Sequence, residues 1–237
     1  MMDVVAAVFA RGGSKGVLRK NLRQVGGSSL VELAIRHAQG CSSVERVVVS
    51  TDDKEIADVA LQAGAEVPWL RPAVLADDLA REWDAWRHLV SWMSEQGPLP
   101  SVLLVAPCTA PLRLPSDLDR CVEACMEPGV DVAVTVTESS RSPWFNMVTL
   151  DSSGNARLVL EPQNPVSRRQ DTPKTYDVGT VGFAVRPSFV LSNDGIYEGT
   201  VRAVAVPKER SLDVDDEVDL VIAEALLAQR ETGLITR

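Results

Sequence analysis

The chain has 237 residues, 45% hydrophobic and 24% charged, which is enough for one domain over 1–237 with a sizeable core. Its 33 acidic residues outnumber its 24 Lys and Arg, so the formal charge of −9 argues against nonspecific nucleic-acid binding and requires any basic site to be local. The apolar run Val4 to Ala10 is about a third of the roughly 20 residues that a membrane helix needs, and no basic segment precedes it. We therefore expect a cytoplasmic protein without membrane association. The four cysteines form no CxxC pair, and the two histidines are too few for a multi-histidine metal centre.

Apolar segments alternate in type along the chain. Val4 to Ala10 is typical of a buried parallel strand. After a polar, glycine-rich loop over 11–28, the helical spacing from Leu30 to Ala38 predicts a helix that ends at Gly40. The patterns that follow predict further elements in turn, namely strand 47–49, helix 53–63, helix 80–93, strand 102–105, helix 115–125 and strand 130–136. This alternation predicts an α/β, Rossmann-like fold, a mostly parallel sheet with helices on both faces.

The pattern changes between about 140 and 175. Val148 to Leu150, the turn Asp151 to Gly154 and Ala156 to Leu160 predict an antiparallel hairpin with a polar extension. We interpret this segment as an arm or a small subdomain. Strands at 181–185 and 201–206 and an amphipathic helix at 218–229 then complete the expected domain.

The loop after the first strand contains a cluster of cations among glycines. It reads Ala10-Arg-Gly-Gly-Ser-Lys-Gly16, followed by Arg19-Lys20-Asn21. Glycines let backbone N–H groups turn toward an anion, and the serine and cations complete a cradle for a triphosphate. The GxxxxGK[ST] and GxGxxG spacings are absent, which argues against a P-loop ATPase and a dehydrogenase. The alternative is a solvated turn, but four cations in a net acidic protein favour a phosphate site.

A second polar segment, Ser211 to Asp216, follows the predicted strand at 201–206. Asp213 and Asp215 alternate along an extended stretch, so both carboxylates can point to one side and hold Mg²⁺ together with nucleotide phosphates. The alternative is that Asp215 caps the final helix, with acidic residues in its first turn. Capping leaves Asp213 unexplained, and a triphosphate site needs a metal to offset its charge. We therefore favour the two-ligand magnesium site.

Two further features have competing explanations. Trp83, Trp86, Leu89 and Trp92 share roughly one helical face, where we favour core packing over base stacking and keep Trp83 as the candidate for stacking. Arg113 lies at the end of a predicted strand. There it either contacts an acceptor carboxylate or forms a surface ion pair.

Six fragments, spread over nearly the whole chain, occur in the order and at the spacing of a known family. They are Ala10 to Gly16 with Lys20-Asn21, Val48-Val-Ser-Thr-Asp-Asp53, Ala65-Glu-Val-Pro with Arg71-Pro72, Pro107 with Pro111-Leu-Arg113, Arg169-Gln-Asp-x-Pro-Lys174, and Asp213-x-Asp215. In these fragments the sequence resembles the cytidylyltransferases that activate acidic sugars. The resemblance is to CMP-N-acetylneuraminate (acylneuraminate) synthetases and, more distantly, to CMP-Kdo synthetases.

The resemblance implies a transferase that moves CMP from CTP to an acidic sugar, a sialic-acid-like nonulosonate or related 2-keto acid sugar, with release of pyrophosphate. It implies that the nucleotide is held by Ala10, Arg11, Gly12, Gly13, Ser14, Lys15, Lys20, Asn21 and Arg71, and Mg²⁺ by Asp213 and Asp215. Arg11, Lys15, Lys20 and Asp213 are then the residues expected to act in catalysis. Such chemistry needs positioning and charge neutralisation more than a strong base.

The resemblance also implies a homodimer. The insertion at about 140–175 would exchange contacts across the dimer and help complete the partner's acceptor site, with Arg169 and Gln170 acting there. Arg113 is the candidate acceptor contact within the chain.

The departures from the family concern mainly the acceptor end. A glutamine expected to touch the sugar acid is Ala106, a serine pair near the base is Arg81-Glu82, and an Asn-Gly pair is Val178-Gly179. These changes leave room for another acid acceptor (a Kdo-like sugar, a small carboxylate or a phosphonate), for another nucleotide, or for a catalytically inactive nucleotide-sugar-binding module. The retained Lys15 and Asp213 disfavour the inactive module. A glycosyltransferase would be expected to keep an Asp-x-Asp near mid-chain, and none is there.

Overall fold

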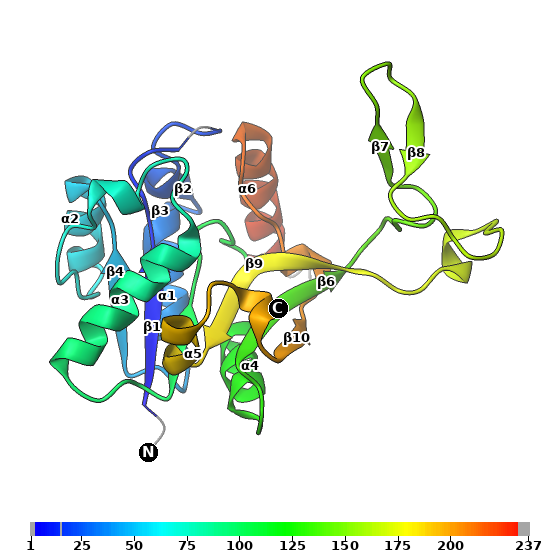
Figure 1. Ribbon diagram of the computed structural model, residues 1–237. Helices are drawn as coiled ribbons and strands as arrows, with labels where there is room; N and C mark the ends of the chain where they lie inside the picture. Colours follow the sequence, from blue (N-terminus) through cyan, green and yellow to red (C-terminus); the bar gives the residue numbers. More distant parts are fainter. Residues whose placement is uncertain (1–2, 15, 232–237) are drawn as a thin grey trace.

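A six-stranded sheet forms the centre of the computed structural model, which describes residues 3–14 and 16–231 (Figure 1). Its strand order is β10-β6-β9-β5-β1-β4. β1 pairs in parallel with β4 and β5, and β6 in parallel with β10, whereas β9 runs antiparallel between β5 and β6. The predicted mostly parallel sheet is thus confirmed. The strands are β1 (Val4–Phe9), β4 (Arg46–Ser50), β5 (Val102–Val105), β6 (Val132–Glu138), β9 (Tyr176–Val185) and β10 (Val201–Ala205).

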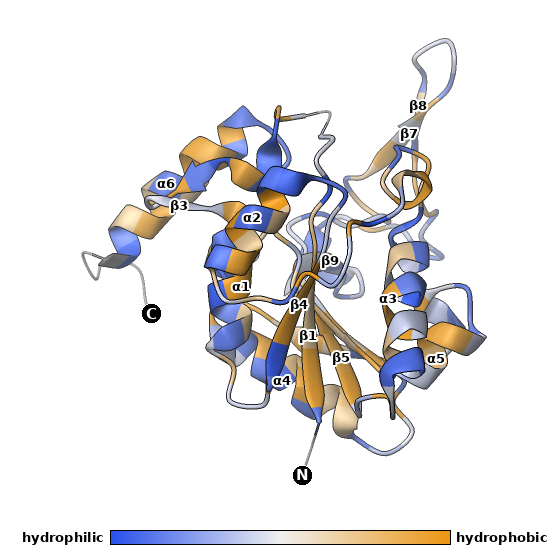
Figure 2. Cartoon of the chain, turned by 90° about the vertical axis from the view of Figure 1, so that its left-hand side faces the viewer, coloured by the Kyte–Doolittle hydropathy of each residue, from blue (hydrophilic) through white to orange (hydrophobic). Residues whose placement is uncertain are grey.

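Helices cover both faces of this sheet, as Figures 1 and 2 show. One face packs against α1 (Leu30–Gln39), α2 (Lys54–Gln62), α4 (Pro115–Met126) and α6 (Glu217–Glu231). The other face packs against α3 (Glu82–Gln96) and the short α5 (Pro187–Ser192). β1 supplies both cores, because Val4, Ala6 and Val8 enter the first and Val5 and Ala7 enter the second. A strand buried on both faces needs a continuous apolar run, which is why this segment lacks alternation.

Local signals explain where the first two helices begin and end. Ser29 and Glu32 form a reciprocal capping box at the start of α1, and Gly40 follows its last residue. The side chain of Asp53 accepts hydrogen bonds from the backbone N–H groups of Glu55 and Ile56 and so begins α2. These caps fix the ends of the loops that lead into the site.

The tryptophan stripe of α3 belongs to the second core. Trp83 and Trp86 are buried, and their ring centroids lie 5.3 Å apart, while Phe183 of β9 lies 5.7 Å from Trp86. Leu89 is fully buried, and Trp92 packs against the same core. The favoured prediction of core packing is therefore confirmed, and Trp83 does not line the cavity described below.

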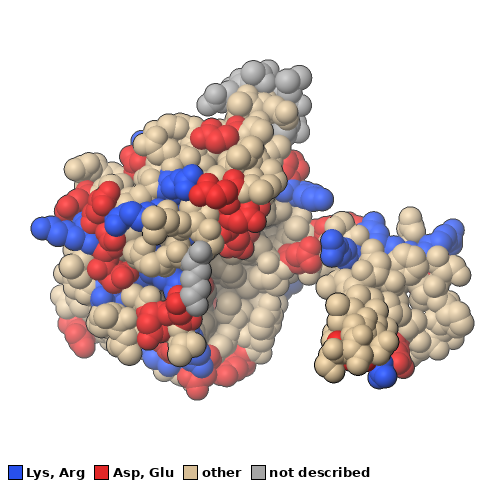
Figure 3. Space-filling view, turned by 90° about the horizontal axis from the view of Figure 1, so that it is seen from above, with Lys and Arg blue, Asp and Glu red and all other residues tan. Residues whose placement is uncertain are grey.

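An arm, residues 139–175, leaves the sheet between β6 and β9 and stands away from the body of the molecule (Figures 1 and 3). Its antiparallel hairpin joins β7 (Val148–Leu150) to β8 (Ala156–Leu158), as predicted. β9 begins at Tyr176, earlier than predicted, and its first residues pair with the end of β6 outside the core. Exposed apolar side chains are frequent on the arm and its stem, namely Phe145, Met147, Val148, Leu150, Val159, Leu160, Tyr176 and Val178.

Some short elements were not predicted. The loop at 11–28 contains a small antiparallel pair, β2 (Gln24–Val25) and β3 (Ser28–Ser29), which turns through two glycines with positive φ. α5 was missed as well, because six residues are too few for a helical period to show. Single 3-10 turns occupy Lys20–Leu22, Ala73–Leu75, Arg169–Asp171, Ile196–Glu198 and Lys208–Arg210. No helix within 3–14 and 16–231 is both long and apolar enough to cross a membrane.

Candidate active site

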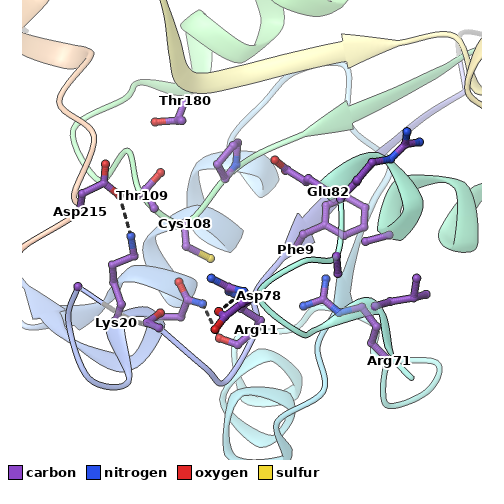
Figure 4. Close-up of a pocket in the computed structure, with 18 of the residues that line it drawn as sticks. Phe9, Arg11, Lys20, Arg71, Asp78, Glu82, Cys108, Thr109, Thr180 and Asp215 are labelled. Atoms are coloured by element: carbon purple, nitrogen blue, oxygen red, sulfur yellow. Dashed lines mark hydrogen bonds and ion pairs between the residues drawn. The ribbon is translucent and has the colours of Figure 1, made fainter. Parts of the chain in front are cut away.

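A cavity of about 550 Å³ opens where β1 and β5 end. Its walls come from the loop after β1, the segment 71–85, the loop after β5, β9 and the segment before α6. The carboxyl ends of parallel strands are where α/β sheets bind ligands, and the volume is in the range of small-molecule sites. Figure 4 shows the residues that line it, with Lys20 and Arg11 on one side and Glu82 and Thr180 on the other.

The loop after β1 supplies the cationic side of the cavity. Arg11, Ser14, Lys20 and Asn21 all line it, as predicted for the phosphate site. Asn21 is buried and its Nδ2 donates to the carbonyl oxygen of Arg11 at 2.9 Å, which fixes the turn. The Arg11 guanidinium forms an ion pair with Asp78 of the neighbouring segment at 3.2 Å. This loop is thus anchored before any substrate binds.

The other predicted loop residues lie at the edge of the cavity or beyond it. Ala10 is fully buried at the end of β1, and the backbone N–H of Gly12 donates to Asp52 Oδ1 at 3.0 Å. A Cβ at Gly12 would lie 2.6 Å from Asp53 Oδ2, so the close approach requires glycine. Gly13 is open to solvent on the side where a Cβ would stand. Lys15 lies outside the described residues, and Arg19 turns away to pair with Asp53 and Glu55.

The second polar segment meets this loop. Asp213 and Asp215 line the same cavity, so the predicted convergence of the two side chains is found. Lys20 Nζ donates to the carbonyl oxygen of Val214 at 2.8 Å and lies 3.1 Å from Asp215 Oδ1 (Figure 4). A Cβ on Gly16 would overlap the carbonyl oxygen of Asp215. The phosphate loop and the carboxylate pair are therefore in direct contact.

The carboxylate pair fits a divalent cation that is shared with a ligand. Oδ1 of Asp213 is buried and has no hydrogen-bond partner among the residues that the structure describes, and an unsatisfied carboxylate oxygen is costly unless something binds it. No group of three or more His, Cys, Asp or Glu suited to a metal exists in the part of the chain that the structure describes. A cation at the pair would therefore need oxygen ligands from phosphate or water, which is the usual mode of Mg²⁺.

The capping alternative for Asp215 is wrong. It is Asp216 whose Oδ1 accepts from the backbone N–H groups of Val218 and Asp219 at 2.8 and 3.0 Å and so caps α6. Asp215 is left free of that task and faces the cavity.

Arg71 and Glu82 are two further charged residues that line the cavity. Arg71 is 7% exposed and lies 3.7 Å from Asp52, and its buried Nε has no hydrogen-bond partner within 3–14 and 16–231. Burial lowers the pKa of Arg71, and the charge of Asp52 opposes that shift. The protein atoms around the Glu82 carboxyl displace water from it, and this desolvation raises its pKa although part of the residue is exposed. Trp86, which donates to Glu82 Oε1 at 3.2 Å, opposes this shift.

Cys108 lines the floor of the cavity as a neutral thiol. It is 3% exposed, and burial raises its pKa to about 12. A thiolate nucleophile at this position is therefore not available at neutral pH.

The prediction that Arg113 contacts the acceptor is not supported, because its side chain lies beneath the floor of the cavity. Arg113 is 1% exposed and donates to the carbonyl oxygens of Ala110 and Pro107. Burial lowers its pKa to about 10. Its partners are the backbone of the loop after β5, and Thr109 of that loop accepts from the N–H of Val214 at 2.8 Å. Arg113 thus supports the loop that holds the carboxylate segment.

Arg169 and Gln170 are not brought to this cavity by their own chain. They line a smaller hollow of about 150 Å³ at the base of the arm, where Arg169 Nη1 donates to the carbonyl oxygen of Ser139 at 2.8 Å. Their predicted role in a partner's site stays a prediction.

The sequence reading missed several residues that line the cavity. They come from four parts of the chain that only the fold brings together, namely β1 (Phe9), the segment 71–85 (Asp77 and Asp78), the loop after β5 (Thr109) and β9 (Thr180 and Phe183). Glu82 appeared only as a departure from the family pattern. Glu82 directly precedes Trp83, the first tryptophan of the α3 stripe, and is the first residue of α3. This position was the local signal that could have indicated its place at a helix start.

The sheet, the anchored cationic loop and the paired carboxylates define an α/β protein built to hold a phosphorylated nucleotide. Residues 5–198 match the family model described as Cytidylyltransferase. The chain belongs to this cytidylyltransferase family.

Curated relatives match over nearly the full length of both chains. A CMP-N,N'-diacetyllegionaminic acid synthase of Legionella pneumophila is 30% identical over 99% of this chain and 100% of its own. A pseudaminic acid cytidylyltransferase of Campylobacter jejuni is 28% identical over 95% of this chain and 96% of its own. Among solved structures, a CMP:2-keto-3-deoxy-manno-octonic acid synthetase complexed with CTP has a TM-score of 0.72 at 18% identity, covering 96% of this chain and 99% of that one. This last likeness confirms the Rossmann-like nucleotidyltransferase fold.

Proposed function

We propose that this protein transfers CMP from CTP to a nonulosonate, an acidic nine-carbon sugar of the sialic, legionaminic or pseudaminic acid class, and releases pyrophosphate. The observation that carries this proposal is the contact between the cationic loop and the carboxylate pair, through Lys20 and Asp215, in a member of the cytidylyltransferase family. The near full-length similarity to synthases of CMP-activated legionaminic and pseudaminic acids supports the acceptor class.

In this proposal Arg11, Ser14, Lys20 and Asn21 hold the triphosphate, because all four line the cavity, and contacts within the chain fix the positions of Lys20 and Asn21. Asp213 and Asp215 hold Mg²⁺, which supplies charge neutralisation at the phosphate under attack. The anomeric hydroxyl of the acceptor attacks the α-phosphorus, and the bond to the β-phosphate oxygen breaks to release pyrophosphate. Lys20 belongs to the cationic loop and contacts Asp215, so its positive charge can help to balance the negative charge of the phosphates beside the carboxylate pair.

We further propose that the arm pairs two copies of the chain into a homodimer. The arm and its stem expose Leu150 at 67%, Val148 at 53% and Tyr176 at 50%, and Figure 3 shows the arm as a separate lobe with broad uncharged areas. Exposed apolar surface of this kind favours a protein interface. In the dimer Arg169 and Gln170 contribute to the partner's acceptor site.

A cytoplasmic location is part of the proposal. The CTP that the reaction needs is a nucleotide of the cell interior, and the four buried cysteines are all unpaired. Free thiols without disulfides are typical of a reducing compartment.

The test is pyrophosphate release from each of the four ribonucleoside triphosphates with legionaminic, pseudaminic, N-acetylneuraminic and Kdo acids. We expect release with CTP and at least one nine-carbon acid, and none without acceptor. Release with Kdo alone would overturn the acceptor class, and no release with any pair would favour a catalytically inactive binding module.

A further inference from the structure

Asp117, in the first turn of α4, has a fully buried carboxylate that the proposed reaction does not use. Oδ2 accepts from the backbone N–H of Leu114 at 3.0 Å and from Nε of Arg210 at 2.9 Å. Oδ1 accepts from Nη2 of Arg210 and from Nη2 of Arg120, both at 3.0 Å. Burial raises the pKa of Asp117, but these hydrogen bonds, that from Arg210 foremost, bring the pKa below its ordinary value. The carboxylate is therefore ionised at neutral pH, and its acceptor sites are used by the protein itself.

The contact between Arg210 and Asp117 has a single well-defined geometry. Two nitrogens of one planar guanidinium donate to the two oxygens of one carboxylate, which is the bidentate arrangement that only arginine can make. The side chain of Arg210 is 13% exposed and that of Asp117 is 0% exposed, so solvent screens this ion pair far less than a surface pair. Neither residue lines the cavity. The pair can therefore influence the site only through the chain that connects them.

Arg210 precedes Asp213 by three residues, at the start of the carboxylate segment (211–216). On the other side of Asp213, Val214 is fully buried, and its N–H donates to the carbonyl oxygen of Thr109. Between these two anchors, the backbone N–H groups of Leu212 and Asp213 make no hydrogen bond within 3–14 and 16–231. The place of Asp213 therefore depends on the anchor before it and the anchor after it.

We propose that Arg210, held by Asp117, is a positioning residue that keeps the carboxylate segment in the geometry in which Asp213 and Asp215 bind Mg²⁺ together. This role rests on the proposed function, in which these two carboxylates hold the metal. Groups that fix the place of metal ligands without contacting the metal typically contribute about 10- to 100-fold to metal affinity or activity. Loss of the ion pair should therefore weaken the metal site in a protein that is still folded.

The test is Arg210→Gln, which removes the bidentate contact. Leu114 and Arg120 still donate to Asp117, so the fold should survive. The probe is Mn²⁺ in the presence of CTP, with free Mn²⁺ measured by electron paramagnetic resonance. We expect the dissociation constant for Mn²⁺ to rise about 10- to 100-fold. In Arg210→Lys, which keeps the charge but not the planar fork, the rise should be smaller.

Hydrogen exchange tests the positioning without metal or nucleotide. In Arg210→Gln the amides of 211–216 should exchange at least about 10-fold faster than in the unaltered protein, because one of their two anchors is gone. The amides of β1 and β5, in the middle of the sheet, should exchange at the unaltered rate. A merely structural role of the ion pair would accelerate exchange in all of these segments together.

Arg120→Gln is the matched control. It removes the other guanidinium from the same carboxylate, but Arg120 belongs to α4, and its second partner is the carbonyl oxygen of Ala205 at 2.9 Å. Ala205 is already held by its pairing with Val136 of β6. Thermal stability should fall in this variant, while the affinity for Mn²⁺ and the exchange of 211–216 should stay unchanged.

The inference is overturned if Arg210→Gln binds Mn²⁺ as the unaltered protein does, or if Arg120→Gln weakens binding by the same factor. It is also overturned, without affecting the proposed function, if the unaltered protein releases pyrophosphate but binds no Mn²⁺. Failure of the proposed function gives a different result, namely no pyrophosphate from the unaltered protein with any acceptor. Mn²⁺ binding and hydrogen exchange still decide the inference in that case.

Discussion

The phosphate side of the cavity and the arm differ in the origin of their contacts. On the phosphate side, Asn21, Lys20 and the N–H of Gly12 are each held by another part of the same chain. The arm makes its contacts within itself and its stem, and leaves apolar residues such as Leu150 exposed. The contacts on the phosphate side are therefore made within one chain, whereas Arg169 and Gln170 of the arm lie away from this cavity.

On the phosphate side of the cavity, the largest effect is expected from removing the charges of the two carboxylates. Asp213→Asn and Asp215→Asn should each lower turnover at least about 1000-fold, because several kcal/mol of charge neutralisation at the phosphate are lost. The measurement is pyrophosphate release from CTP over a magnesium titration. Asp216→Asn is the control, since asparagine caps a helix as well as aspartate and Asp216 does not line the cavity. Normal turnover in either of the first two variants would refute the metal assignment.

A single methyl group should disturb the contact between the loop and the carboxylate segment. In Gly16→Ala the new Cβ overlaps the Asp215 carbonyl oxygen, so the two segments must separate, and we expect turnover to fall about 100-fold. Gly195→Ala, where a Cβ would meet nothing within 4 Å, should leave turnover unchanged. Steady-state kinetics at saturating CTP would measure both, and equal rates would show that the contact is not needed.

The arm can be tested by mixing subunits. Arg169→Ala should raise the acceptor KM about 10-fold and leave the KM for CTP unchanged, whereas Arg168→Ala, which removes an exposed arginine paired with Asp171, should alter neither. If the arm serves the partner's site, mixing Arg169→Ala chains with Asp213→Asn chains restores activity, because one site of the mixed dimer has an intact cavity and an intact arm. Activity that stays at the sum of the separate variants would place Arg169 in its own chain's site, or in none.

The smallest effect concerns the stability of the body. Burial, and then the charges of Arg113 and Arg230, lower the pKa of His37 from its ordinary 6.5 to about 3. The unfolded chain takes up a proton below pH 6.5 while the folded chain does not, so stability falls as the pH drops from 6.5 toward 3. The loss is about 1 kcal/mol per pH unit. Urea denaturation at several pH values gives the free energy of unfolding as a function of pH. In His37→Gln this free energy should fall less steeply between pH 6.5 and 3, and an unchanged pH dependence would contradict this account.

Local sequence patterns were sufficient to predict most strands and helices of the central sheet and its helical layers, because these elements depend on neighbouring residues. The apolar run of β1 and the end of α1 at Gly40 lie at the predicted places, because burial on two faces and a terminal glycine are visible in the sequence itself. The placement of Asp213 and Asp215 beside the cationic loop was predicted from their alternation along an extended stretch and from the need of a triphosphate site for a metal.

Features that depend on packing between distant segments were not predictable. Arg113 was expected at the end of a strand but lies in the loop between β5 and α4, where its side chain is oriented by the carbonyl groups of Pro107 and Ala110. Glu82 becomes a cavity residue only because α3 begins beside Arg71. Asp215 and Asp216 are neighbours of equal capping propensity, and only the observed start of α6 distinguishes them.

β9 is central in the sheet and at the same time carries the arm. Its residues Phe183 and Ala184 enter opposite cores, so a slip of one residue would turn every core side chain of the strand to the wrong face. Over Phe183 to Val185 the strand is paired on both sides, with β5 and with β6. Toward the arm, Tyr176 to Val178 pair with β6 alone, so the direction in which the arm leaves the body is set by this two-stranded extension of the sheet.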